Sequence, residues 1–446
     1  MKFRITLPKK TRFSHFVFCL LFITLSQNTI LAQSVPINAT VISNANNVDF
    51  SSNSIDGNLS TKAEIRASSG LLLGIGAYSG FLELEFPTTL PANTTSYVKI
   101  DTDENLLPAL LGGSLGGLLS NVLGSVLIGN QEFTVQAKNG ATVVLEGNSQ
   151  VANNFASNNL RIVTNAQNEY FIALTPSQSY NRIRIINRLG SLVGLGNTKK
   201  LGVYGAFYVQ TQDNCGSASY TSYSGSGLSL DLLNIGGAGV INANHVIDSD
   251  PNNFSKLSLG ILAVAASINQ TVYFDGLSDP SDQFLIRLKV DPSLLALGVA
   301  NNIQIIGYND SNVVQTANLN SLLNLDLLNL LQGNQIATIP FVPNGAVNRI
   351  TVRYSSLLNV QLTQSLDLYD IKRVPPPPVI TDAFTLNPIV CSGATASLVA
   401  NTVAGTTIHW YSQPTGGTLL ATTNSGNAYV TNALTQNTSF YVAAAD

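Results

Sequence analysis

The sequence carries one series of landmarks twice, and this internal repeat constrains the fold more than any other feature. Residues 33–212 and 213–374 follow the same order of strand-like runs and turn segments. The closest match pairs PSQSYNRIRI, which begins at Pro176, with PNGAVNRITV, which begins at Pro343. Self-similarity of this kind indicates that one structural unit has been duplicated along the chain. The sequence therefore predicts two copies of one domain in tandem.

The runs between the turns are typical of β-strands. FLELEF (81–86), RIRII (182–186) and TVYFDG (271–276) are short, rich in β-branched or aromatic residues and separated by Gly, Asn, Asp and Pro. No long segment shows a helical period with capping residues. We therefore expect an all-β fold in which each copy is a jelly-roll-like β-sandwich.

An Asn-Arg pair lies late in each copy and precedes a tyrosine at a similar distance. The tyrosines are Tyr204 in the first copy and Tyr369 in the second. We expect Arg182 and Arg349 to lie at the start of a strand and to face outward. An ion pair or the cover of an aromatic ring is the expected role, with ligand binding as the alternative.

The first residues have the three parts of a secretory signal peptide. MKFRITLPKKTRF is basic, FVFCLLFITL (16–25) is apolar, and Ala32 is a small residue at the expected cleavage site. The apolar run is shorter than the roughly 20 residues that span a bilayer, which argues against the alternative of an uncleaved anchor. Cleavage of residues 1–32 would leave 414 residues and would remove Cys19.

The charge of the remaining chain limits its partners. Loss of the five basic residues of the signal peptide changes the formal net charge from −3 to −8. An acidic chain is a poor partner for nucleic acid or for an anionic membrane surface, and we expect neither. Charged residues make up only 11% of the chain, so amides and hydroxyls supply its polarity, as in many extracellular β-proteins.

A proline run separates the repeats from a small C-terminal domain. PPPPVI, residues 375–380, predicts a stiff extended linker. Residues 381–446 contain further strand-like runs, among them TIHWYS, which includes the single tryptophan, Trp410. A large ring on a strand of so small a domain is expected to fill its core.

The motifs of this C-terminal domain resemble a known family. They are VCSG at 390–393, HWY at 409–411, TGGTLL at 415–420 and SFYV at 439–442. This set resembles the bacterial Ig-like domains found in tandem in large surface proteins of Bacteroidota, often upstream of a type IX (gliding-motility-type) sorting domain. The resemblance implies an Ig-like β-sandwich on an exported surface protein.

The cysteines bear on how complete this domain is. In the family that it resembles, a second cysteine commonly follows the last strand, so the resemblance implies that Cys391 forms a disulfide with a residue beyond Asp446. We therefore expect the chain to be the front end of a longer, multi-domain surface protein. The state of Cys215, between the two repeats, stays open.

The repeats themselves resemble a second family over fewer residues. IDGNLST, residues 55–61, is similar to the early DGN…T signature of galactose-binding-like and discoidin-like jelly rolls. The tryptophan that usually follows is absent, since Lys62 and Ala63 stand there. The resemblance implies a loop that can hold a structural calcium ion and opposite loops that can bind glycans.

Several acidic and amide side chains are candidate calcium ligands. The resemblance points to the IDGNLST loop, and the DTDEN and DSD segments place hard oxygens at loop spacing, which is what calcium prefers. The candidate ligands are Asp56, Asn58, Asp101, Asp103, Asp248 and Asp250.

Each copy also contains a leucine-rich insert. The inserts are residues 110–129 and 319–333, and the first holds a 19-residue stretch without charge. We expect these segments to pack on one another at one end of the sandwich, around a short helix. A surface patch for a partner and membrane insertion are the alternatives, because exposed apolar patches usually mark interaction sites.

The sequence predicts no catalytic site. Glu83 and Glu85 lie two positions apart on one predicted strand, but 25 acidic residues make one such pair expected by chance. We therefore expect a secreted or cell-surface adhesin or structural protein, with a surface glycan or protein as the partner, whose binding residues the sequence does not identify. Polysaccharide-binding modules of a secreted carbohydrate-active enzyme are the alternative.

Overall fold

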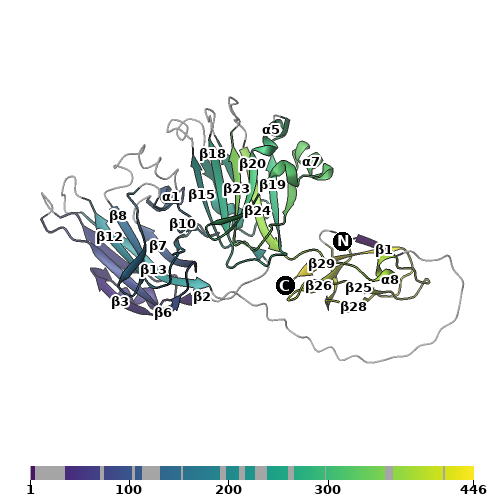
Figure 1. Ribbon diagram of the computed structural model, residues 1–446, viewed down its shortest axis with the longest axis horizontal. Coiled ribbons are helices and arrows are strands. Elements are labelled where there is room, and N and C mark those ends of the chain that lie inside the picture. Colours follow the sequence, from purple (N-terminus) through teal and green to yellow (C-terminus); the bar gives the residue numbers. More distant parts are fainter. Residues whose placement is uncertain are drawn as a thin grey trace.

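The protein is an elongated series of β-domains (Figure 1). The computed structural model describes residues 2–5, 36–70, 75–102, 106–112, 131–151, 154–190, 197–209, 216–226, 239–259, 266–296, 298–356, 365–414 and 417–445. Strands dominate these ranges, so the predicted all-β class is confirmed. Within the same ranges, no helix has the length and apolar character that a membrane crossing requires.

The first repeat packs two sheets face to face. One sheet has the order β3-β6-β12-β8-β9, and the other contains β10-β11-β7-β13-β5-β4, with β2 paired to β13. The elements are β2 (Pro36–Asn38), β3 (Val41–Asn46), β4 (Val48–Asp49), η1 (Ser51–Ile55), β5 (Ala63–Ser68), β6 (Gly80–Leu90), β7 (Ser96–Thr102), α1 (Leu106–Leu111), β8 (Gln131–Asn139), β9 (Thr142–Asn148), β10 (Leu160–Thr164), β11 (Tyr170–Leu174), β12 (Tyr180–Leu189) and β13 (Thr198–Val209).

The second repeat has the same arrangement. Its sheets run β15-β18-β23-β20-β21 and β16-β17-β24-β19-β22, with β14 paired to β24. The elements are β14 (Gly216–Ser217), β15 (Tyr220–Ser226), β16 (Gly239–Ile241), η3 (Ala243–Ile247), β17 (Ser255–Ser258), β18 (Ser267–Tyr273), β19 (Gln283–Val290), α5 (Pro292–Ala296), η4 (Val299–Asn301), β20 (Ile303–Asn309), β21 (Asn312–Asn318), α6 (Leu319–Leu322), α7 (Leu325–Gln332), β22 (Ala337–Phe341), β23 (Arg349–Ser355) and β24 (Ser365–Val374).

Asn181 and Asn348 have the same structural role in the two repeats. Asn181 Oδ1 accepts a hydrogen bond of 2.9 Å from the backbone N–H of Gly140, in the turn between β8 and β9. Asn348 Oδ1 accepts one of 3.0 Å from the N–H of Asp310, in the turn between β20 and β21. Each asparagine therefore binds the turn of the equivalent hairpin, β8–β9 in the first repeat and β20–β21 in the second.

The paired tyrosines also have equivalent surroundings. The Lys99 ammonium lies 4.7 Å from the centre of the Tyr204 ring, and the Arg287 guanidinium lies 5.8 Å from that of Tyr369. Each cation comes from the strand beside the tyrosine, β7 in one repeat and β19 in the other. A cation over a ring gains electrostatic attraction and shields the ring from water.

Each sandwich has its own apolar core, built by alternation along its strands. β19 shows the pattern most clearly, because every second side chain from Phe284 to Val290 is fully buried. The second leucine-rich insert contributes to this core through Leu319 and Leu331, at the start of α6 and within α7. Leu325 of α7 is 71% exposed, so this insert is only partly buried. Most of the first insert lies outside the described residues.

The C-terminal domain is a small sandwich around Trp410. Its sheets are β1-β29-β26-β27 and β25-β28. Trp410 is fully buried, as predicted, and its Nε1 donates a 3.0 Å hydrogen bond to Thr423 Oγ1. The elements are β1 (Lys2–Ile5), α8 (Ala383–Leu386), β25 (Ser397–Val399), β26 (Thr407–Tyr411), β27 (Leu419–Asn424), β28 (Ala428–Val430) and β29 (Thr438–Ala445).

Both ends of this domain are defined by backbone pairing. Val379 and Asn401 exchange backbone hydrogen bonds of 2.8 Å, and Ile380 packs into the core, so the folded part begins within the predicted linker. At the other end β1, from the predicted signal peptide, pairs antiparallel with β29 and covers its edge (Figure 1).

Candidate functional site

The two repeats are joined edge to edge rather than held apart by a linker. Strand β10 of the first repeat pairs with β15 of the second through Thr164 and Thr221. This pairing connects a sheet of each repeat, and the described strands form one 12-stranded sheet from β21 to β4. In Figure 1, β10 and β15 lie next to each other where the repeats meet. The repeats therefore form one unit with a fixed junction.

A cluster of aromatic rings fills this junction. The ring of Tyr97, on β7, stacks on the ring of Tyr220, on β15, with centroids 4.4 Å apart. Phe171 meets Tyr220 edge to face at 5.0 Å, and Phe207 stacks on Tyr97 at 5.7 Å. All four rings are at most 8% exposed. Such ring pairs contribute roughly 0.5–1.5 kcal/mol each beyond the burial of their area, so the cluster holds the repeats together.

Arg349 lies inside the junction, so the prediction that it faces outward is wrong. Its guanidinium donates hydrogen bonds to Asn158 O at 2.9 Å and to Thr175 Oγ1 at 3.2 Å, both in the first repeat. It also lies 5.1 Å from the centre of the Tyr273 ring. The reason is that this face of the second repeat is covered by the first, and the residue is 5% exposed.

A polar cleft opens beside the junction. It has a volume of about 210 Å³ and is lined by both repeats. Its main polar side chains are Asn93, Tyr97, Asp275, Asp310, Asn348 and Arg349. Burial raises the pKa of the Tyr97 phenol well above its ordinary value, and the charge of Asp275 raises it further, so this hydroxyl stays protonated. Clefts between domains are common positions for ligand sites.

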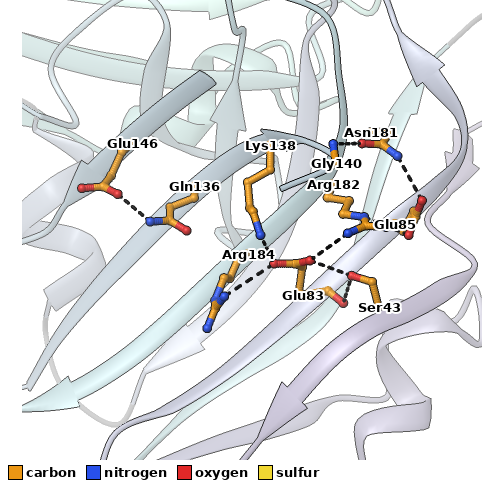
Figure 2. Close-up of polar contacts among 10 residues, drawn as sticks. All are labelled: Ser43, Glu83, Glu85, Gln136, Lys138, Gly140, Glu146, Asn181, Arg182 and Arg184. Carbon is orange, nitrogen blue, oxygen red and sulfur yellow. Dashed lines mark hydrogen bonds and ion pairs between the residues drawn. The ribbon is translucent and has the colours of Figure 1, made fainter. Parts of the chain in front are cut away.

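The equivalent face of the first repeat is a charged surface instead (Figure 2). Glu83, on β6, accepts a 2.5 Å bond from the Lys138 ammonium and a 2.9 Å bond from the Ser43 hydroxyl. Arg184 contributes a second cation at 3.7 Å and covers the ring of Phe81 at 3.7 Å. Glu83 is 3% exposed, so its carboxylate oxygens bind neighbouring side chains and are shielded from water.

Glu85 is engaged in the same way. Arg182 Nε donates to Glu85 Oε2 at 2.9 Å, and Asn181 Nδ2 donates to Glu85 Oε1 at 3.0 Å. The ion pair expected of Arg182 is therefore present. Burial opposes ionisation of Glu83, but the hydrogen bonds from Lys138 and Ser43 outweigh it, and its pKa lies below the ordinary value of 4.5. A carboxyl group that stays ionised in this way cannot serve as a general acid near neutral pH.

The predicted calcium ligands of the two acidic loops are hydrogen-bonded within their own loops. Asp56 Oδ1 accepts from the N–H of Asn58 at 2.8 Å, and its Oδ2 accepts from the Thr61 hydroxyl at 2.7 Å. In the second repeat, Asp248 Oδ1 accepts from the N–H of Asp250 at 3.0 Å. These hydrogen bonds close each loop locally. They also occupy carboxylate oxygens that a calcium ion would need as ligands.

Asn58 and Asp250 extend the same pattern. Each accepts a hydrogen bond from the backbone two residues further on, at 3.0 Å from Ser60 and at 2.9 Å from Asn252. The two loops therefore share this hydrogen-bond pattern, although the backbone of Asp56 is helical (ψ −5°) and that of Asp248 is extended (ψ 173°). Calcium takes six to eight oxygen ligands, so binding at either loop would require oxygens from outside it, and the calcium site stays a prediction.

The remaining candidate residues lie apart from these loops. Asp101 Oδ2 accepts hydrogen bonds of 2.8 Å from the Lys62 ammonium and from the Tyr204 hydroxyl. Asp103 lies outside the described residues. Over the described ranges, no group of three or more His, Cys, Asp and Glu side chains is placed to hold a metal ion.

Cys391 is exposed and carries a free thiol among the described residues. It lies in the turn that precedes Ala394, whose backbone N–H donates a 3.0 Å hydrogen bond to Cys391 O. The disulfide with a partner beyond Asp446 stays a prediction, and Cys215 lies outside the described residues.

The sequence did not identify the junction residues, although one signal was present. In β7, Tyr97 and Val98 are both buried, although neighbouring side chains of a strand point to opposite faces. A strand with apolar side chains on both faces indicates that a second layer covers its outer face. Tyr97, Phe171 and Phe207 occupy the outer face of their sheet, where a solvated strand would carry polar residues.

Solved structures that are similar to parts of this chain come from several organisms. CBM32-1 and CBM32-2 of Clostridium perfringens ZmpB, solved with GalNAc, are 11% identical over 75% of this chain and 90% of that chain, with a TM-score of 0.23. Allantoicase from Saccharomyces cerevisiae is 5% identical over 66% of this chain and 76% of that chain, with a TM-score of 0.20. TM-scores this low leave the ligand to be argued from the chain's own residues.

A two-domain protein of unknown function from Bacteroides fragilis is similar at 11% identity, with 66% of this chain and 84% of that chain covered and a TM-score of 0.20. No curated protein matches the chain. Residues 375–446 match the family model of the Ig-like domain described as CHU_C associated. The resemblance seen around Cys391 and Trp410 is thereby confirmed: the C-terminal segment is an Ig-like domain of this kind.

Proposed function

We propose that this chain is a secreted or cell-surface attachment protein, an adhesin or structural protein without catalytic activity. The observation that supports this most is the junction of the repeats, where the Thr164–Thr221 pairing and the rings of Tyr97 and Tyr220 join two sandwiches into one unit. Such a unit can present a binding surface in a fixed orientation. The Ig-like domain behind it serves as a spacer or an attachment point.

The state of the acidic side chains supports a non-catalytic role. Glu83 and Glu85 share one face but are each neutralised by cations, and the pKa of Glu83 is lowered. A glycosidase needs one carboxyl group with a raised pKa and a second one across a cleft. These two side chains hold strands β3, β6, β8 and β12 together instead.

The proposed location rests on the sequence. Residues 1–32 have the basic, apolar and small-residue parts of a signal peptide, and the low charge content suits an extracellular β-protein. The Ig-like domain at 375–446 is of a type that the sequence resemblance links to Bacteroidota and to type IX export.

A binding screen tests this function. The exported chain is applied to immobilised glycans and to immobilised extracellular proteins, and both retention and any change in the mass of the ligand are measured. We expect retention on at least one ligand with no change in its mass. Turnover of a bound ligand would show an enzyme, and absence of retention throughout would remove the attachment role.

A polysaccharide-binding accessory role is the second candidate. The polar cleft between the repeats favours it, because Asp275, Asp310 and Asn93 offer hydrogen-bond partners to hydroxyl groups. Sedimentation with insoluble cellulose, chitin and xylan separates this role from adhesion. Binding to one of these polymers, without binding to host-type glycans or proteins, would favour the accessory role.

A further inference from the structure

The cleft beside the junction exists only because the repeats are fused. Asn93 and Tyr97 supply its wall from the first repeat, and Asp275, Asp310 and Arg349 supply the wall from the second. Its volume is about 210 Å³. That is room for one sugar ring.

The acidic wall is held in place by a pair of hydrogen bonds. Asn348 Nδ2 donates to Asp310 Oδ1 at 2.7 Å, while Asn348 Oδ1 accepts from the N–H of Asp310 at 3.0 Å. Asp310 itself has a positive φ of 51°, a conformation that this residue type tolerates. The carboxylate is thus fixed at the tip of the β20–β21 hairpin, beside the cleft. Side chains that are fixed before binding lose little entropy when a ligand arrives.

The basic wall is equally fixed. Arg349 is held by Asn158 and Thr175 across the junction and by the ring of Tyr273 beneath it. The lining of the cleft thus includes two carboxylates, Asp275 and Asp310, and one guanidinium, Arg349.

This balance selects among ligands. The two carboxylates accept hydrogen bonds and the protonated Tyr97 hydroxyl can donate one, so a ligand rich in hydroxyl groups fits. Because the lining has two carboxylates and one guanidinium, an acidic ligand is disfavoured. We propose that the cleft binds one neutral sugar residue of a glycan, with sugar hydroxyls donating to Asp275 and Asp310. The proposal rests on the glycan binding that both proposed functions allow and assigns it a site.

Titration calorimetry with the exported chain tests the site. The probes are galactose, glucose and N-acetylglucosamine, with glucuronic acid as an acidic counterpart and a lysine-rich peptide as a cationic one. The variant is Asp275→Asn with Asp310→Asn, which keeps the size of both side chains. The control is Glu146→Gln, on β9, where the carboxylate accepts a 2.5 Å bond from Gln136 on the charged face.

We expect a neutral sugar to bind, glucuronic acid to bind at least tenfold more weakly, and the double variant to lose at least tenfold in affinity while the control keeps it. Circular dichroism and the melting temperature check that the variant is folded. Equal binding by the double variant, or tighter binding of glucuronic acid or the peptide, would overturn the proposed site.

Two failures remain distinguishable. If the exported chain attaches to immobilised proteins but binds none of the sugars, the cleft proposal is wrong and the attachment function stands. If it attaches to nothing in the screen of glycans and proteins, both are wrong.

Discussion

The ring of Tyr97 in the first repeat stacks on the ring of Tyr220 in the second, with 4.4 Å between centroids and 24° between planes. Neither side chain is more than 8% exposed, although both lie outside the cores of their own sandwiches. The contact is therefore part of a third apolar cluster that belongs to the pair of repeats.

The first prediction concerns this contact. Tyr220→Ala should lower the free energy of unfolding by roughly 3–5 kcal/mol, because it leaves a cavity among buried rings. Denaturant titration measures the loss. Tyr78→Ala is the matched control, since Tyr78 is 36% exposed, and it should change stability by less than about 1 kcal/mol. Equal effects of the two variants would mean that the junction does not contribute to stability.

The second prediction concerns the ion pair between Glu83 and Lys138. Glu83→Gln leaves the Lys138 ammonium, 10% exposed, without its closest anion. Removal of one partner of a buried pair typically costs roughly 3–5 kcal/mol, and we expect a loss in that range. Glu146→Gln, on the same face but exposed, is the control. A double variant, Glu83→Gln with Lys138→Met, should recover part of the loss, which a general defect in folding would not show.

The third prediction concerns acid. The pKa of Glu83 is lowered from 4.5, so its contribution to stability is complete above pH 4.5 and disappears as the pH falls from there through the folded-state pKa. The melting temperature of the wild type should therefore fall more steeply below pH 4.5 than that of Glu83→Gln. Parallel curves for the two proteins would contradict this.

The fourth prediction concerns the edge of β29. In the structure, Lys2 to Ile5 pair with Tyr441 to Thr438, and the predicted cleavage after Ala32 would remove this strand. Backbone amides on that edge should exchange faster in the exported chain than in a chain that keeps residues 1–32. Hydrogen exchange read by mass spectrometry measures this, with β26, paired on both sides, as the internal control.

The fifth prediction concerns calcium. The carboxylates of Asp56 and Asp248 already accept hydrogen bonds within their loops, from Thr61 and Asn253 among others. We therefore expect EDTA to leave the melting temperature unchanged. A clear rise on addition of calcium, abolished by Asp56→Ala or by Asp248→Ala, would instead establish the metal site predicted from the sequence.

Much of the architecture could be predicted from the sequence, because a duplicated unit leaves its landmarks at matching positions. The Asn-Arg pairs and the two acidic loops do occupy equivalent places, and Trp410 fills the small core. The position of Arg349 could not be predicted. Its surroundings depend on the joining of β10 to β15, which involves one residue from each strand and has no local signature.

The candidate binding site escaped prediction for a related reason. Asn93 and Asp310 are 217 positions apart in the sequence and are brought together only by the junction. Each lies in an ordinary polar turn, and neither shows a motif. These polar turn residues form one cleft only because the two repeats are in contact. The sequence pattern within either repeat does not indicate that contact.

The continuous sheet across the two repeats also has a mechanical consequence. Where domains are joined by a flexible linker, tension extends the linker first and leaves the binding sites intact. Here the cleft walls belong to different repeats, so a pull that separated β10 from β15 would also draw Asp310 away from Asn93. Rupture of the junction and dissociation of a ligand bound in the cleft would then occur together. The stability of the aromatic cluster would therefore set the unbinding force.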